Sequence, residues 1–196
     1  MNYLAHLFLA GNNSEIILGN FIADHVKGSN ILLYNDLVRK GIAMHRDIDR
    51  FTDNHPVVKQ SIERLRPHFH KYSGVVVDMF YDHFLSANWS EYSTIDLESF
   101  TKKGYDLLNL YKELLPERSA RLLFYMEKQN WLISYASNEG LHMAFMGMSS
   151  RTKFKSNMEN AVEQLNNCYA CFEKEFRLFF PELQAFVSDN YSAEVA

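Results

Sequence analysis

Apolar residues recur at helical spacing through nearly the whole chain, and this periodicity constrains the fold more than any other feature. Breaks such as Gly11-Asn12-Asn13 and Gly28-Ser29-Asn30 fall where helices would begin or end. The one strand-like run, Val75-Val76-Val77, lies inside a segment of helical pattern. After a short apolar opening at 2–10, we predict helices at about 14–27, 36–53, from Pro56, 74–89, 96–115, 116–128, 131–146 and 153–180, the last ended by Pro181. For 131–146, an interruption at Gly140 is an alternative to one continuous helix.

These segments follow one another without a linker, a repeat or a low-complexity tract, which predicts a single all-α domain over residues 1–196 with roughly eight to ten helices. The 8 glycines and 4 prolines are half the usual share, which disfavours a disordered chain or a turn-rich β-sandwich. The net charge of −4 is too small to indicate nucleic acid or an anionic membrane as a partner. No leader and no membrane-length apolar run is evident, so we expect a cytoplasmic protein.

The two cysteines have the Cys-x-x-Cys spacing of some redox and zinc sites. Apolar residues surround Cys168 and Cys171 at helical spacing, and no second cysteine pair accompanies them. We therefore expect two thiols packed on or beside a helix face.

One apolar stripe in the segment 36–53 becomes polar along its length. After Val38 and Ile42 the same row continues with His45 and Asp49, and Asp53 follows four residues later. Side chains four residues apart project from the same face of a helix, and buried carboxylates need a partner. A divalent cation would serve as that partner, although this row taken alone favours a His–Asp hydrogen-bonded pair at a half-exposed edge.

The segment after Gly74 gives a sharper signal, because it is apolar on nearly every side, as buried helices are. It nevertheless carries Asp78, Asp82 and His83 and contains no lysine or arginine to pair with them. Two facing carboxylates repel one another unless a proton or a metal ion lies between them. This segment therefore favours a binding site over ordinary packing.

Two further polar residues interrupt apolar runs, namely His6 and Asp24. A mixed set of imidazoles and carboxylates without thiolates suits Mn²⁺, Mg²⁺, Fe or Zn²⁺, and such ions support hydrolysis by activated water. No Gly-rich phosphate loop, nucleophile elbow or dinucleotide motif is present. We expect His55 at the rim of a site, and we assign no role to the other four histidines, His25, His68, His70 and His142.

These motifs together resemble the acyl carrier protein phosphodiesterase family, which is similar to the all-helical, metal-dependent HD phosphohydrolases. The matching segments are Met1-Asn2-Tyr3-Leu4-Ala5-His6-Leu7, Gly19-Asn20-Phe21-Ile22-Ala23-Asp24, His45-Arg46-Asp47-Ile48-Asp49 with Thr52-Asp53-Asn54, 78–85, and Gly147-Met148-Ser149-Ser150-Arg151. The chain departs from the pattern of relatives at Phe8, often a second histidine, and it contains no His-Asp dipeptide.

The resemblance implies hydrolysis of the phosphodiester that joins 4′-phosphopantetheine to a serine of holo acyl carrier protein, which gives apo carrier protein. Mn²⁺ is the metal it implies, with Mg²⁺ or Fe as alternatives. We expect the metal centre and its surroundings to consist of His6, Asp24, His45, Asp49, Asp78, Asp82 and His83. Arg46 or Arg151 would offset charge on the phosphoryl oxygens, and Asp53 or His55 would handle the proton of the leaving serine.

The charge is distributed unevenly in a way that suits an acidic carrier protein. Residues 27–71 contain nine Lys or Arg and five Asp or Glu, whereas the segments on either side are net negative. We predict a salt-sensitive docking face drawn from Lys27, Arg39, Lys40, Arg50, Lys59, Arg64 and Arg66. Two other functions remain open, namely an HD-type phosphohydrolase acting on a nucleotide or small phosphoester, and a noncatalytic helical interaction module.

Overall fold

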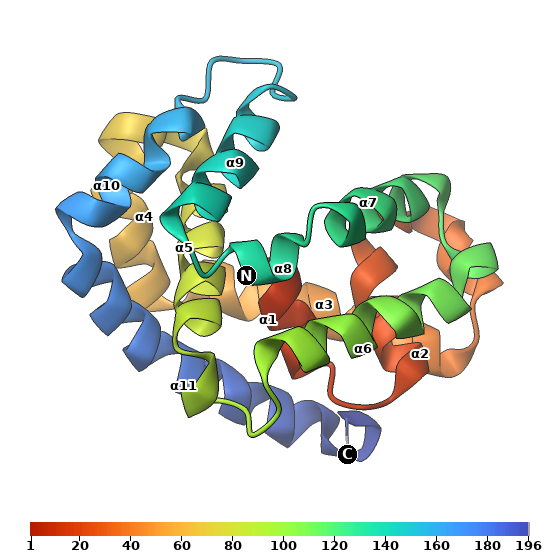
Figure 1. Cartoon of the computed structure of the whole chain (residues 1–196). Helices are drawn as coiled ribbons and strands as arrows, with labels where there is room; N and C mark the ends of the chain where they lie inside the picture. The colour runs from red at the N-terminus through yellow and green to blue at the C-terminus, as the bar shows by residue number, and fades with distance from the viewer. Residues whose placement is uncertain (196) are drawn as a thin grey trace.

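The computed structural model describes residues 1–195, with side chains through Tyr191, and every regular element in that range is helical. Figure 1 shows the helices in chain order. The α-helices are α1 (Tyr3–Leu9), α2 (Ser14–Ile22), α3 (Asp36–Asn54), α4 (Pro56–Phe69), α5 (Ser73–Ala87), α6 (Leu97–Leu110), α7 (Glu117–Lys128), α8 (Trp131–Ser134), α9 (Asn138–Ser149), α10 (Ala161–Asn167) and α11 (Tyr169–Val195). The predicted all-α class is confirmed, with eleven α-helices in the described residues instead of eight to ten. Among the short 3-10 turns between them, η1 (Ala23–His25) directly follows α2.

The helix boundaries follow the caps that the sequence contains. Asn35 accepts a hydrogen bond from Val38 N at the start of α3, and Asp96 accepts one from Ser99 N at the start of α6. Pro56 occupies the first turn of α4, where its missing N–H costs nothing. The run Val75–Val77 is helical within α5, as predicted.

Several predicted boundaries are wrong. The helix expected at 14–27 ends at Ile22, the one expected at 96–115 ends at Leu110, and the one expected from 153 begins at Ala161. The 131–146 segment is two helices, because the Ser137 side chain accepts a hydrogen bond from Gly140 N and starts α9 afresh. The segment 153–180 is also divided, at Cys168. Its second part, α11, continues past Pro181 to Val195, because Phe180 and Leu183 on either side of the exposed proline are fully buried.

The cysteines also differ from the prediction, because Cys168 and Cys171 form a disulfide instead of two packed thiols. The helix break at Cys168 gives that residue a non-helical backbone and brings the two Cα atoms to 5.3 Å. Helical periodicity on both sides of the break concealed it in the sequence.

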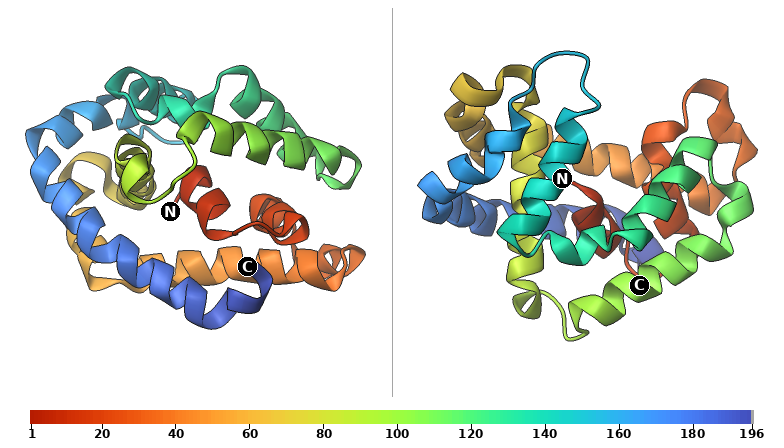
Figure 2. Two further views of the ribbon diagram at one scale, coloured as in Figure 1. Left: turned by 60° about the horizontal axis from the view of Figure 1, so that its bottom comes forward. Right: turned by 45° about the horizontal axis from the view of Figure 1, so that its top comes forward.

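The long helix α11 packs along α3, α4 and α5 and closes one side of the molecule (Figures 1 and 2). Its buried face is a row of phenylalanines, among them Phe172, Phe176 and Phe180, which contacts aromatic side chains of α5. Burial of each such side chain stabilises the fold by about 1.5–3 kcal/mol.

The helices that carry the polar residues meet inside this frame. In Figure 2 the segment containing α1 and α2 lies between α3 on one side and α6 on the other. The backbones of α2 and α3 touch at two glycines: a Cβ on Gly19 would lie 2.0 Å from Val38 O, and a Cβ on Gly41 would lie 2.3 Å from Ile16 O. No larger residue fits at this crossing, which brings Asn20 next to the turn of α3 that carries His45.

A second contact fixes α1. The Asp82 carboxylate of α5 accepts hydrogen bonds from the backbone N–H groups of Asn2, Leu4 and Ala5 at 3.2, 2.8 and 3.3 Å. These are the donors that the first turn of a helix leaves without intrahelical partners, and a negative charge there also suits the helix dipole. The position of His6 on α1 therefore depends on α5.

Candidate metal centre

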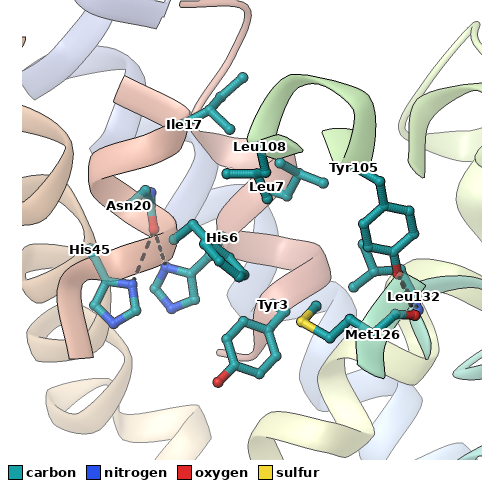
Figure 3. A pocket seen from close by; sticks show the side chains of 11 residues that line it. Tyr3, His6, Leu7, Ile17, Asn20, His45, Tyr105, Leu108, Met126 and Leu132 are labelled. Carbon is teal, nitrogen blue, oxygen red and sulfur yellow. Dashed lines mark hydrogen bonds between the residues drawn. The ribbon is translucent and has the colours of Figure 1, made fainter. Parts of the chain in front are cut away.

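Two buried histidines from different helices lie face to face. The rings of His6 on α1 and His45 on α3 are stacked, with centroids 4.0 Å apart and planes inclined by 21°. Figure 3 shows both rings beneath the side chain of Asn20, with the apolar side chains of Leu7, Leu108 and Met126 to one side. The opposite side of the pair faces a cavity.

Asn20 holds both rings through the same atom. Its Oδ1 accepts hydrogen bonds from His6 Nδ1 at 3.0 Å and from His45 Nδ1 at 3.1 Å (Figure 3). Because an amide oxygen only accepts, each ring must carry its proton on Nδ1. In a neutral imidazole the Nε2 atom then carries a lone pair, and both Nε2 atoms point the same way, toward carboxylates.

Two carboxylates complete the cluster. Asp49 lies with Oδ1 at 3.1 Å from His6 Nε2 and Oδ2 at 3.2 Å from His45 Nε2, while Asp24 Oδ1 lies 3.4 Å from His45 Nε2. Ligand atoms of His6, His45 and Asp49 all lie within 4.8 Å of one another. Lone pairs on nitrogen and oxygen thus converge on one point, and they need a cation between them. The donor set and its close spacing fit a divalent metal ion.

The electrostatics of the metal-free cluster agree with this need for positive charge. Burial lowers the pKa of His45, but hydrogen bonds and charges from Asp24 and Asp49 outweigh it and raise the pKa to about 9. Burial lowers the pKa of His6 to about 4, and the neighbouring His45 acts in the same direction. Burial would raise the pKa of Asp49, but its contacts with His45 and His6 hold it well below its usual range. One proton on His45 therefore takes the place that a metal ion would take.

The cavity in front of the cluster has a volume of about 280 Å³. It is lined by side chains of α1, η1, α3, α5 and α9, namely Met1, Asn2, Tyr3, His6, Asp24, His45, Asp49, Asp53, Val75, Asp78, Met79 and Met148. Burial and the charge of Asp24 raise the pKa of the Tyr3 phenol to about 12, so Tyr3 remains a hydrogen-bond donor at neutral pH. We refer to this space as the reaction cavity.

Two of the predicted α5 residues are held by the beginning of the chain. The Asp78 carboxylate accepts a hydrogen bond from the Met1 ammonium at 2.9 Å at the wall of the reaction cavity. Burial raises the pKa of Asp78, although the ammonium opposes this. Burial also raises the pKa of Asp82 to about 7, against the effect of its three backbone donors and the ammonium, and Asp82 does not line the cavity.

His83 lies apart from the cluster. Its Nδ1 donates to Tyr135 O at 2.8 Å, and its Nε2 accepts from the Tyr169 hydroxyl at 3.0 Å. Both ring nitrogens are therefore occupied by other partners.

The four residues predicted for transition-state and proton chemistry are also dispersed. Asp53 lines the reaction cavity and is exposed. His55 is buried behind it, where Nδ1 accepts from Val57 N and caps α4, and Nε2 contacts Glu182 at 3.1 Å. Arg46 donates to Val26 O at 2.9 Å, and Arg151 donates to Gly147 O at 2.8 Å beside the cavity.

The predicted docking residues are mostly paired within the chain. Arg50 and Arg66 each form an ion pair with an acidic residue three positions earlier, and Arg39 pairs with Asp36. Arg64 is bound through two hydrogen bonds to the buried Glu175. Lys27 and Lys59 are exposed.

Asn20 and Tyr3 are site residues to which sequence reasoning gave no role. Asn20 lies one turn before Asp24 on an otherwise apolar helix, so a buried amide at that spacing was the available signal. Tyr3 gave no signal, because an aromatic residue near an apolar segment is typical of core packing.

Comparison with known proteins gives a consistent result. The chain matches the family described as acyl carrier protein phosphodiesterase over residues 1–183. It is similar to a protein named acyl carrier protein phosphodiesterase from Photorhabdus laumondii, with 33% identity over 182 residues covering 92% of each chain. Relatives of the same name from an Enterobacter species and Serratia proteamaculans are 32% and 30% identical, and the matches cover 93% and 97% of this chain and 95% and 99% of theirs. No solved structure matches, so the likeness to the HD fold stays a prediction.

Proposed function

The chain belongs to the acyl carrier protein phosphodiesterase family, and on that basis we propose that it releases 4′-phosphopantetheine from holo acyl carrier protein to leave the apo form. The bond that breaks is the phosphodiester bond to the carrier's serine, and water supplies the new hydroxyl on phosphorus. The observation that carries the proposal is the convergence of two imidazole nitrogens and two carboxylates at one point of a cavity. Nitrogen and oxygen donors that converge in this way suit a bound divalent cation.

We propose His6, His45 and Asp49, together with Asp24, as the residues that hold a divalent metal ion. Nitrogen and oxygen donors without thiolate favour Mn²⁺, with Mg²⁺ or Fe as alternatives. When bound, such an ion polarises a phosphoryl oxygen and makes its water acidic enough to supply hydroxide at neutral pH. Asp78 lines the wall of the reaction cavity. Asp82 and His83 have structural roles, because their side chains hydrogen-bond to other parts of the fold.

The remaining residues around the cavity have distinct roles in the proposal. Asn20 keeps both Nε2 lone pairs available by accepting both Nδ1 protons. Tyr3 donates a hydrogen bond to a phosphoryl oxygen. Asp53, exposed at the cavity, carries a proton to the leaving serine oxygen, a role for which His55 is too enclosed.

We propose that the acidic carrier protein docks on the η1 side of the cavity. Arg46 is tied to Val26 O there, directly before the exposed Lys27, and Asp24 of η1 lines the cavity. The proposed partner implies a cytoplasmic location. The Cys168–Cys171 disulfide points the other way, because disulfides are rare in reducing compartments. No helix in residues 1–195 is long and apolar enough to cross a membrane.

The test is an assay of holo carrier protein with metal-stripped protein, to which Mn²⁺ or Mg²⁺ is added back. We expect metal-dependent loss of the 4′-phosphopantetheine mass from the carrier and its recovery as a small product. A parallel panel of nucleotides and small phosphoesters separates the HD-type alternative. Turnover of the panel without the carrier reaction would contradict the carrier substrate, and no turnover with either would favour an interaction module.

A further inference from the structure

A second cavity of about 470 Å³ opens beside the reaction cavity. It runs along α8 and α9, with the end of α7 on its far side, and we call it the α9 groove. Asn2, Tyr3, Met79 and Met148 line both spaces, so the two cavities are direct neighbours on either side of these side chains. The α9 groove therefore begins next to the reaction cavity.

The lining of the α9 groove is apolar with a few polar groups along its length. Met143, Ala144 and Trp131 contribute apolar surface, and Met143 is 69% exposed although it is a large apolar side chain. Gln129 also lines the groove, and its Oε1 accepts a hydrogen bond from Trp131 Nε1 at 2.8 Å, so the donor that its side chain can offer is the amide NH₂. Arg151 adds further N–H donors at the end nearest the reaction cavity, because only its Nε is used by Gly147 O.

A phosphodiester at the metal cluster has two substituents that must leave in different directions. The serine belongs to a folded protein and must stay outside the cavity, so the other substituent needs its own path. Pantetheine is a narrow chain with two amides, a dimethyl-substituted carbon and a thiol, which matches an apolar groove with scattered hydrogen-bonding groups. The volume also lies within the range of about 300–1,000 Å³ that is usual for small-molecule sites.

We propose that the α9 groove binds the pantetheine arm of the carrier protein while the phosphodiester lies at the metal cluster. This inference rests on the proposed function for the identity of the arm. It assigns substrate recognition to α8 and α9, which contribute none of the proposed metal ligands. Met143 and Gln129 would contact the arm along the groove, and Arg151 would lie closest to its phosphate.

Gly147 offers a way to fill the groove without disturbing the backbone. It lines the groove, and a Cβ added there would meet no atom within 4 Å. We expect Gly147→Trp to raise KM for holo carrier protein at least tenfold. The neighbouring Met146 is half exposed on the same helix and does not line the groove, so Met146→Trp is the matched control and should leave KM within twofold.

Pantetheine without its phosphate provides a binding test that needs no turnover. In protein with ¹³C-labelled methionine methyl groups, pantetheine should shift the signals of Met143 and Met148 and leave that of the buried Met44 in place. Gly147→Trp should remove these shifts, and Met146→Trp should retain them. Absence of shifts in the wild type, or an unchanged KM in Gly147→Trp, would overturn the groove assignment. Methionine shifts in a protein that fails to release apo carrier would instead support the groove and contradict the proposed reaction.

Discussion

Two groups of ionisable residues, one on α3 and one on α5, look alike in the sequence but have different hydrogen-bond partners in the fold. On α3, His45 and Asp49 lie against His6 beside the reaction cavity, and the Nε2 atoms of both rings face carboxylate oxygens. On α5, Asp82 faces three backbone N–H groups, and His83 lies between a carbonyl and a hydroxyl. In the first group the ring nitrogens and carboxylate oxygens share either the proton of His45 or a bound cation, whereas in the second group each acceptor already faces a donor of the fold. Only the first group has a place for an added cation, and this difference separates a candidate binding site from a structural one.

The largest expected effect is at Asp49, which touches both histidines. We expect Asp49→Asn to lower kcat/KM for holo carrier protein by at least about 10³-fold, because it removes a proposed ligand charge. The thermal midpoint of the metal-free protein should stay within a few degrees. Steady-state kinetics and metal content of the purified variant check this, and retention of a tenth of the activity would contradict the assignment.

Substitution of Asp82 should lower the stability of the fold and leave metal binding nearly unchanged. Asp82→Asn replaces an acceptor with an NH₂ group that faces backbone donors, so the free energy of unfolding should fall by about 2–3 kcal/mol. Urea denaturation measures this, and metal affinity of the folded protein should remain close to that of the wild type. Asp96→Asn is the control, because Asp96 caps α6 at the exposed surface and asparagine caps equally well. A loss of metal binding without a loss of stability would place Asp82 with the first group.

Asn20 tests whether the orientation of the rings matters separately from the ligands. We expect Asn20→Leu to weaken Mn²⁺ binding by about 10–100-fold, because neither ring would then be held with its proton on Nδ1. Leucine removes the unpartnered Asn20 Nδ2, but it also leaves the Nδ1–H groups of both histidines without their acceptor, so the free energy of unfolding should fall by about 1–3 kcal/mol. Calorimetry gives the affinity, and nitrogen NMR of the imidazoles reports which nitrogen carries the proton.

The conservative variant Asn20→Asp keeps an oxygen acceptor and should restore most of the metal affinity. If leucine and aspartate behave alike, the amide does not position the rings.

The smallest expected effect is on the pH dependence of stability, and it is measured in protein from which a chelator has removed metal. In this protein the two stacked rings should titrate at different pH values. His45 should titrate near pH 9 and His6 near pH 4, compared with about 6.5 in the unfolded chain. Protonation of His45 therefore stabilises the fold fully below pH 6.5, and this contribution is lost as the pH rises through 9. Protonation of His6 has the opposite sign and destabilises the fold as the pH falls from 6.5 through 4. Imidazole NMR measures both pKa values. If both rings titrate near pH 6.5, neither burial nor the carboxylates shift their pKa values as proposed.

Much of this arrangement could be predicted from the sequence. Periodicity and caps identified nearly all the helices, and the polar row of α3 and the lone His6 and Asp24 pointed to residues that the fold brings together. What periodicity cannot provide is the identity of a partner from another helix. Asp82 had the same local pattern as Asp49. The two differ because the backbone N–H groups at the start of α1 donate hydrogen bonds to Asp82. His55 was expected at the rim of a site because it lies beside Pro56, yet its ring is buried and caps α4.

The contact between Gly19 and Gly41 suggests how such a centre could be sought in other chains. Each glycine is a fixed number of residues from the groups that matter, with Asn20 and Asp24 following the first, and His45 and Asp49 following the second at intervals of four. A search pattern built only from the histidines and aspartates would find many solvated helix faces. A pattern that also requires the two glycines would select pairs of helices able to approach closely enough for their side chains to share one ion.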